Sequence, residues 1–410
     1  MDFAPNDAQR LLVTTVRQLM DRFGPDYWLG LEDRQAYPEE FVSEFEAQGF
    51  GSLLLPEEYG GAGGTLTDAA LVLEEIHAGG GNAQPFHGQY YLSFLVSRFA
   101  SEPIRQQYLP ALARGDLRMQ SFALTEPDAG SDLTRITTLA ERDGDRYRIR
   151  GRKVFISRVE QSDLMVLVAR TSPLEEGAKR TEGLTLFLVD LREAKGIQHT
   201  PIRTMFNSQT YELSLDGLEV PAENRIGEEG KGFGVLLHVL NPERILIASE
   251  CLGDARWFID RSAAYAKQRV VFGRPIGSNQ GIQFPLADAY ARLVAADGVR
   301  WHAARLFESD ADPKEVGDYA NIAKYLASEC SWRAANVAMD IHGGYGMARD
   351  MHIERKMRET RLYQVARCRT TWSWPTSPIT CSASRGRTDG RGLDPCDEGA
   401  SCTSRRTTRG

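Results

Sequence analysis

The chain has 410 residues, of which 42% are hydrophobic and 26% are charged, and its formal net charge is −7. This composition is typical of a soluble globular protein with two or three domains. The sequence has no long basic run, which argues against nucleic acid as a partner, and no apolar stretch of membrane-spanning length. Because no basic-then-apolar leader is visible, we expect a cytoplasmic protein.

The pattern of apolar residues changes twice along the chain. Residues 1–117 carry apolar side chains at helical spacing, whereas residues 118–226 contain alternating or continuous apolar runs that predict strands. Helical spacing returns over residues 227–366, in segments 233–268, 281–308, 313–338 and 351–364. We therefore predict an α+β multidomain fold, with an N-terminal helical domain, a middle β-sheet domain and a C-terminal four-helix bundle.

A turn motif leaves the first predicted strand of the middle domain, in the string Phe122-Ala-Leu-Thr-Glu-Pro-Asp-Ala-Gly-Ser131. Such a turn directs backbone N–H groups and hydroxyls at one point, which suits an anionic or flavin-like ligand. Taken alone, these residues also fit an ordinary strand-to-loop turn. The whole string, together with Phe155-Ile-Ser157, resembles the flavin-binding signature of the acyl-CoA dehydrogenase family, flavoenzymes that oxidise acyl-CoA thioesters.

This resemblance extends from residue 1 to about residue 366 and implies FAD as the cofactor. Phe155 stands where many relatives have tryptophan, Ser157 where threonine is common, and Asp340 where glutamine is usual. In the family, the segments that begin at Arg269 and Asp340 reach the flavin nucleotide of a neighbouring subunit. The cofactor-binding residues implied by the resemblance are Phe122, Leu124, Thr125, Gly130, Ser131, Phe155, Ile156, Ser157, Arg269, Phe272, Gln280, Asp340, Ile341, His342, Gly343 and Gly344.

Oxidation of a thioester at Cα and Cβ requires a base for the α proton and a cofactor to accept the β hydride. Our candidate base is Glu243, in the string Asn241-Pro242-Glu243-Arg244, where we expect Asn241 to cap a helix and Pro242 to fill its first turn. Without the family, a glutamate here is better explained by the helix dipole.

The resemblance favours Glu243 as the base. Family members keep the catalytic glutamate either late in the chain or on this helix, just before an arginine, as in isovaleryl-CoA-type enzymes. The late position holds Arg367, whereas Glu243-Arg244 matches the second option. Arg244 and Ser131 are then expected to contact the acyl-CoA.

The predicted activity is α,β-dehydrogenation of an acyl-CoA in fatty acid metabolism, with an electron-transferring flavoprotein as acceptor and a homodimer or homotetramer as the assembly. One alternative is an acyl-CoA oxidase or another flavoenzyme on the same fold, because fold does not determine chemistry. Another is a non-catalytic acyl-CoA-binding partner subunit. We expect no metal, since the seven histidines lack metal-ligand spacing.

The last segment, residues 367–410, departs from the rest in composition, being rich in Arg, Thr, Ser, Cys and Gly without helical periodicity. It fits a natural disordered tail, except that its tryptophans and four cysteines are unusual for one. A displaced reading frame is the interpretation we favour. Back-translation with one restored cytosine after Ala366 gives an amphipathic string that resembles the closing helix of many family members.

Overall fold

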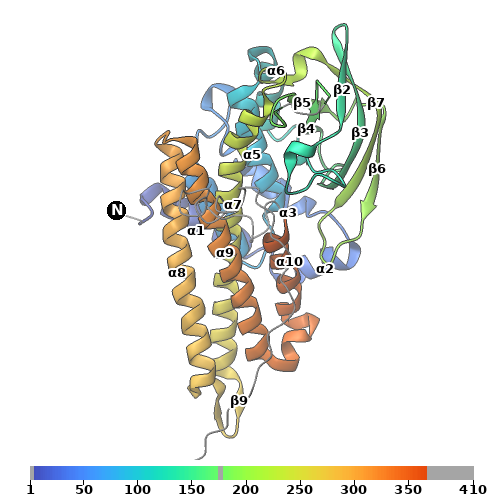
Figure 1. Ribbon diagram of the computed structural model, residues 1–410. Helices are drawn as coiled ribbons and strands as arrows, with labels where there is room; N and C mark the ends of the chain where they lie inside the picture. The colour runs from blue at the N-terminus through green and yellow to red at the C-terminus, as the bar shows by residue number, and fades with distance from the viewer. Residues whose placement is uncertain (1–3, 174–178, 367–410) are drawn as a thin grey trace, which may run out of the picture. The chain divides into compact units, whose positions relative to one another are not determined.

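The computed structural model describes residues 4–173 and 179–366, so the prediction for the tail lies outside the described residues. The described chain begins with helices, blue to teal in Figure 1, whose buried apolar side chains belong to the main hydrophobic core. Helix α4 begins at a capping box, in which Thr65 and Asp68 satisfy each other's backbone N–H groups. These helices are α1 (Asp7–Met20), α2 (Pro25–Arg34), α3 (Glu39–Ala47), α4 (Leu66–Ala78), α5 (Gln84–Phe99) and α6 (Glu102–Ala113).

The middle region is a mainly antiparallel sheet with the strand order β6-β7-β3-β2-β4-β5-β8, and β1 pairs in parallel with β4. Strands β4 and β5 are buried along almost their whole length, as their continuous apolar runs predicted, while β3 alternates between buried and exposed positions. The strands are β1 (Ser121–Ala123), β2 (Leu139–Asp143), β3 (Arg146–Ser157), β4 (Leu164–Arg170), β5 (Leu184–Asp190), β6 (Ile197–Ile202), β7 (Thr210–Pro221) and β8 (Arg225–Ile226).

The C-terminal region consists of long helices, and Figure 1 shows α7, α8 and α9 running alongside one another. A short hairpin of β9 (Val270–Val271) and β10 (Arg274–Pro275) joins the first two of them. The predicted domain order and helical bundle are confirmed. The helices are α7 (Gly232–Gln268), α8 (Gln280–Glu308), α9 (Pro313–His342) and α10 (Ile353–Val365).

The expected helix start at Asn241 is wrong, because α7 already begins at Gly232 and Pro242 lies inside it. Apolar residues before and after this point, including Leu236 and Ile245, are buried along the same helix, so packing outweighs the local start signal. The Asn241 side chain instead donates a hydrogen bond to the carbonyl of Pro313, at 3.0 Å. Glu243 therefore lies in the interior of a 37-residue helix.

Helix α7 is joined to two other elements by buried charges. Asp254 accepts contacts from His77 Nδ1 of α4 at 2.8 Å and from Lys356 Nζ of α10 at 2.5 Å, and all three side chains are inaccessible to solvent. Burial would raise the pKa of Asp254, but the charges of Lys356 and His77 outweigh it and lower that pKa. At the preceding residue, a Cβ on Gly253 would lie 2.2 Å from the carbonyl of Glu74, so α4 and α7 can approach this closely only at glycine.

No helix of the described ranges, 4–173 and 179–366, is both long and apolar enough to cross a membrane.

We predict that Lys356→Met lowers the free energy of unfolding by about 3 kcal/mol or more, because it leaves the Asp254 carboxylate buried beside only a histidine. The double variant Asp254→Asn/Lys356→Met should lose less, since it removes both charges. Chemical denaturation followed by circular dichroism measures the effect. Arg114→Met serves as the control, because the Arg114–Asp116 pair is on the surface. Equal losses for Lys356→Met and Arg114→Met would contradict the prediction.

Candidate active site

Glu243 lies on the buried face of α7, with 1% of its surface exposed. Oε1 of this carboxylate is 3.8 Å from Nε2 of His87, which lies in the first turns of α5. A buried carboxylate beside an imidazole is a group that can accept a proton out of contact with water. The sequence placed Glu243 in the site but gave no signal for His87.

Aromatic rings connect Glu243 to the predicted flavin segment. The ring of His87 contacts Tyr91 edge-on, with centroids 5.3 Å apart, and Tyr91 contacts Phe122 at 6.0 Å. Phe122 and Leu124 are buried, and Thr125, two residues after β1, is half-buried. Residues that are more than a hundred positions apart in the sequence are therefore brought together.

A buried ion pair joins the two predicted flavin segments. Lys153 Nζ donates to Oε1 of Glu126 at 2.9 Å and to the carbonyl of Leu124 at 3.1 Å. The backbone N–H of Val154 donates to the carbonyl of Thr125 at 2.9 Å. Sequence reasoning missed this pair, although both residues lie inside the motifs that it used. The pair fixes β3 against the turn after β1, and so places Phe155 and Ser157 near Thr125.

Backbone strain marks the second of these segments. Phe155 and Arg158 have φ angles of 58° and 55°, and Gln209, which accepts a hydrogen bond from the N–H of Arg158 at 2.7 Å, has a φ of 41°. Such conformations are unfavourable for residues with a side chain and often occur at functional sites. Phe155 is also 63% exposed, whereas Ile156 is buried and Ser157 is half-buried.

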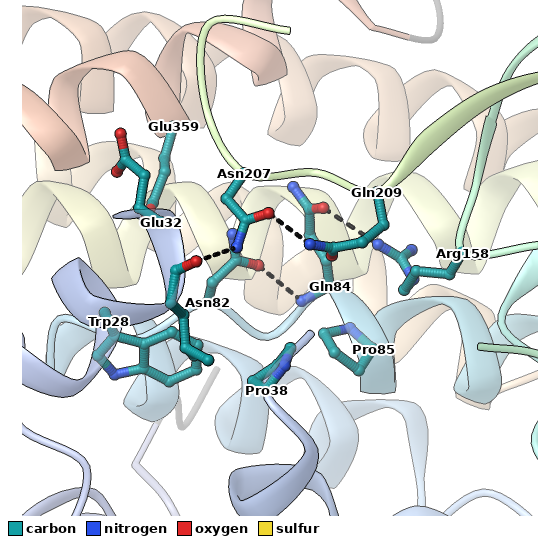
Figure 2. A pocket seen from close by; sticks show the side chains of 11 residues that line it. Trp28, Glu32, Pro38, Asn82, Gln84, Pro85, Arg158, Asn207, Gln209 and Glu359 are labelled. Carbon is teal, nitrogen blue, oxygen red and sulfur yellow. Dashed lines mark hydrogen bonds between the residues drawn. The ribbon is translucent and has the colours of Figure 1, made fainter. Parts of the chain in front are cut away.

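Polar side chains surround Arg158, which lies at the end of this strained segment. Figure 2 shows Arg158, Gln84, Asn207 and Gln209 around a small cavity of about 30 Å³, close to the space of one water molecule. Arg158 Nη1 donates to Oε1 of Gln84 at 3.1 Å, and Asn207 Nδ2 donates to the carbonyl of Ala36 at 2.8 Å. These bonds connect Arg158 to α5, and the loop before β7 to the segment between α2 and α3.

A second cleft, of about 670 Å³, lies at the far end of the helical bundle and contains several predicted cofactor residues. Arg269 and the loop after α9 line it together, although they are over seventy positions apart. Gly343 has φ 57° and ψ −134°, a conformation open essentially only to glycine. The predicted residues that line the cleft are Arg269, Ile341, His342, Gly343 and Gly344.

Other predicted cofactor-binding residues lie outside both the Glu243 site and the cleft at the end of the bundle. Gly130 and Ser131 are exposed in the loop after β1, and Gln280 and Asp340 are exposed at helix ends. Phe272 is fully exposed at the tip of the β9–β10 hairpin. Their side chains face solvent in this single chain, so it does not bring them to the Glu243 site.

Arg244 and His342 occupy different environments. Arg244 is half-buried, and its Nη1 lies 3.4 Å from Oδ1 of Asn241. His342 is buried, stacks on Tyr265 at 4.2 Å and contacts the carbonyl of Ala338 at 2.8 Å. Burial lowers the pKa of His342.

Within residues 4–173 and 179–366, no group of three His, Cys, Asp or Glu side chains is arranged to hold a metal ion.

The fold is that of an acyl-CoA dehydrogenase. Models of the N-terminal, middle and C-terminal domains of this family match residues 6–116, 121–218 and 230–367. The solved structure of glutaryl-coenzyme A dehydrogenase with glutaryl-CoA is similar with a TM-score of 0.84 and 28% identity, over 95% of this chain and 98% of that chain.

Relatives of similar sequence support the same family assignment. The chain is 32% identical to acyl-CoA dehydrogenase FadE12 of Mycobacterium tuberculosis, over 89% of this chain and 93% of the relative. It is 31% identical to the caffeyl-CoA reductase-Etf complex subunit CarC of Acetobacterium woodii, over 82% of this chain and 87% of the relative. The chain therefore belongs to the acyl-CoA dehydrogenase family of oxidoreductases, whose cofactor is FAD.

The Lys153–Glu126 ion pair at the predicted flavin segments makes stability depend on acidic pH. Burial would raise the pKa of Glu126, but the Lys153 charge and hydrogen bonds from Thr137 and Thr138 outweigh it and lower that pKa to about 2. Because the folded pKa lies below the unfolded value, the Glu126 contribution is complete above about pH 5 and is lost as the pH falls toward 2.

We expect the wild-type protein to lose more thermal stability between pH 5 and pH 3 than Glu126→Gln, which has no carboxylate to protonate. Differential scanning calorimetry at both pH values measures the difference. Glu141→Gln, a surface change on β2, should follow the wild-type pH dependence. An unchanged pH dependence in Glu126→Gln would show that this carboxylate carries none of the acid sensitivity.

Proposed function

We propose that the chain is an FAD-dependent acyl-CoA dehydrogenase in which Glu243 removes the α proton of the thioester. The observation that carries the proposal is the continuous contact from buried Glu243 through His87 and Tyr91 to Phe122. It joins the candidate base to the segment whose motif indicates flavin. A base of this kind needs a site that excludes water, and all four side chains are buried.

Three features of the chain fit FAD. Phe155 is an exposed aromatic ring held by a strained backbone, which suits stacking on an isoalloxazine ring. The hydroxyls of Thr125 and Ser157, on neighbouring segments, suit hydrogen bonds to the polar edge of that ring. In the cleft at the end of the bundle, Arg269 provides a guanidinium for a pyrophosphate, beside a glycine loop that leaves its backbone accessible.

The reaction divides between the cofactor and the side chains. FAD, when bound, accepts the hydride from Cβ. Glu243 accepts the α proton on a carboxylate oxygen, and the electron pair of that C–H bond stays with the substrate to form the new double bond. We place Arg244 and Ser131 on the acyl-CoA side, where a cation and a hydroxyl can hold its polar groups.

We predict that Glu243→Gln retains FAD and acyl-CoA binding but loses turnover by about 100- to 10,000-fold, because the amide keeps the shape and cannot accept the proton. Steady-state dye reduction measures turnover, and flavin absorbance measures occupancy. Glu315→Gln, an exposed change in the first turn of α9, is the matched control. Turnover near the wild-type level in Glu243→Gln would rule out this base.

Anaerobic mixing with acyl-CoA separates the dehydrogenase from the alternatives. Bleaching of the flavin, followed by electron transfer to a dye and little peroxide in air, supports a dehydrogenase. Rapid peroxide formation in air indicates an oxidase, and an unchanged flavin spectrum indicates a non-catalytic acyl-CoA-binding subunit.

An electron-transferring flavoprotein is the proposed electron acceptor. The relative CarC is named as a subunit of a reductase-Etf complex, which supports an association of this kind. We further propose a homodimer or homotetramer in which the β9–β10 hairpin and the cleft at the end of the bundle meet a neighbouring subunit. Apolar side chains there and along α8 face solvent in the single chain, which is typical of an interaction surface. They are Val270, Phe272, Phe284, Tyr290, Val294 and Met347.

Phe272→Asp should weaken assembly and lower FAD occupancy together, because it places a charge on the exposed tip of the hairpin. Sedimentation velocity and the ratio of flavin to protein measure both effects. Leu11→Asp, which changes another exposed apolar residue on α1, should change neither. Full flavin occupancy in a monomeric wild-type protein would contradict the proposed assembly.

A further inference from the structure

His87 lies between two buried carboxylates of the same helix. Its Nε2 is 3.8 Å from Oε1 of Glu243, and its Nδ1 is 3.3 Å from Oε1 of Glu250. Seven residues separate the two glutamates, so they occupy one face of α7 about 10 Å apart along its axis. The two nitrogens of the imidazole ring point in different directions, so one nitrogen faces each carboxylate. Neither its position on α5 nor the family motifs indicate this arrangement.

The charges of this bridge are nearly isolated from water. Glu243 and Glu250 are each 1% exposed, and His87 is 8% exposed. Two ionised carboxylates in such a place are costly unless a positive charge is close. Burial by itself would lower the pKa of His87, but the two glutamates outweigh it and raise that pKa. The two carboxylates therefore favour the protonated form of the ring.

The surroundings contain other titratable groups, which contribute to the local charge. They lie on α5, α7, α9 and α10. One of them is the buried Lys324, whose charge acts on the thiol of Cys251, the residue after Glu250. These groups are Tyr91, Cys251, Asp254, Lys324 and Tyr363. Asp254 is paired with Lys356 and His77, whereas His87 lies within 4 Å of both glutamates.

We propose that His87 is a positioning residue for the base: it ties Glu243 to Glu250, fixes the orientation of the Glu243 carboxylate and keeps that carboxylate ionised. The inference rests on the proposed function, in which Glu243 accepts the α proton. A carboxylate buried without a cation takes up a proton and can no longer act as a base. The imidazolium prevents this, and Glu250 shares its charge so that Glu243 is not left as the sole counter-ion.

The bridge also balances charge during the reaction. Before proton transfer, the two carboxylates and the imidazolium together carry one negative charge. When the proton moves from Cα to an oxygen of Glu243, the remaining Glu250–His87 pair is neutral. The negative charge then resides on the substrate, where the electron pair of the broken C–H bond remains until the β hydride leaves. No unpaired charge is left on the protein side of the site.

Two variants test this role in the full-length protein. In His87→Gln, the acidic limb of the kcat/KM pH profile should move up by about one to three pH units, because Glu243 loses a cation within 4 Å. Glu250→Gln removes the second negative charge near Glu243 and keeps the His87 side chain, and it should move the limb the opposite way. His199→Gln is the matched control, since His199 pairs with Glu160 at 3.0 Å on the surface and should leave the profile unchanged.

A second readout does not depend on activity. NMR titration of isotope-labelled histidine, with the His87 signal assigned by its loss in His87→Gln, should give a pKa above 6.5 that falls in both Glu250→Gln and Glu243→Gln. A His87 that is neutral at pH 7, or a His87→Gln profile like that of the wild type, would overturn the proposal.

The two proposals fail in different ways. Full turnover in Glu243→Gln would reject Glu243 as the base and, with it, the positioning role. The titration of His87 would still respond to both glutamates in that case, and the bridge would remain only as a feature of the fold. If His87→Gln does not fold, as judged by flavin content and melting temperature, the wild-type titration and the Glu250→Gln profile decide the matter.

Discussion

Helix α7 carries three carboxylates that have almost no access to water, and the need to neutralise them determines what packs on that helix. Glu243 and Glu250 face His87 of α5, and Asp254 faces His77 of α4 and Lys356 of α10. Each partner comes from a different segment, so the charges can be satisfied only when the N-terminal helices and α10 both reach α7. The packing of these helices and the arrangement of the candidate site therefore depend on the same contacts.

The middle domain also buries charged side chains that must be paired, at the predicted flavin segments. Lys153 and Glu126 are buried together between β3 and the turn after β1, and their pairing fixes the relative position of Thr125 and Phe155. The pKa of each member is lowered, but for a different reason. Burial lowers the pKa of Lys153 to about 8, whereas the Lys153 charge and hydrogen bonds outweigh burial and lower the pKa of Glu126 to about 2. At neutral pH both are charged, and their contact holds the two segments together.

Periodicity was sufficient to predict the long elements, because α7, α9 and the buried strand β4 bury regular apolar patterns. Local signals failed where packing opposed them, as at Asn241. Strand β6 was missed because it is an edge strand whose middle residues are all exposed, which leaves no alternation to detect. The motifs indicated Glu243, Phe122 and the glycine loop as candidates, whereas His87 gave no signal, because it meets Glu243 only through a contact across 156 positions.

The central claim is that Glu243 takes the α proton, and covalent labelling by a 3-alkynoyl-CoA tests it most directly. Removal of the α proton and reprotonation at Cγ convert this thioester into an allene, and a carboxylate next to Cα then adds to its central carbon. Peptide mapping by mass spectrometry identifies the modified residue in the protein reconstituted with FAD. The account predicts one acyl-CoA adduct on Glu243, absent from Glu243→Gln. An adduct on a different carboxylate, or equal labelling of both proteins, would contradict it.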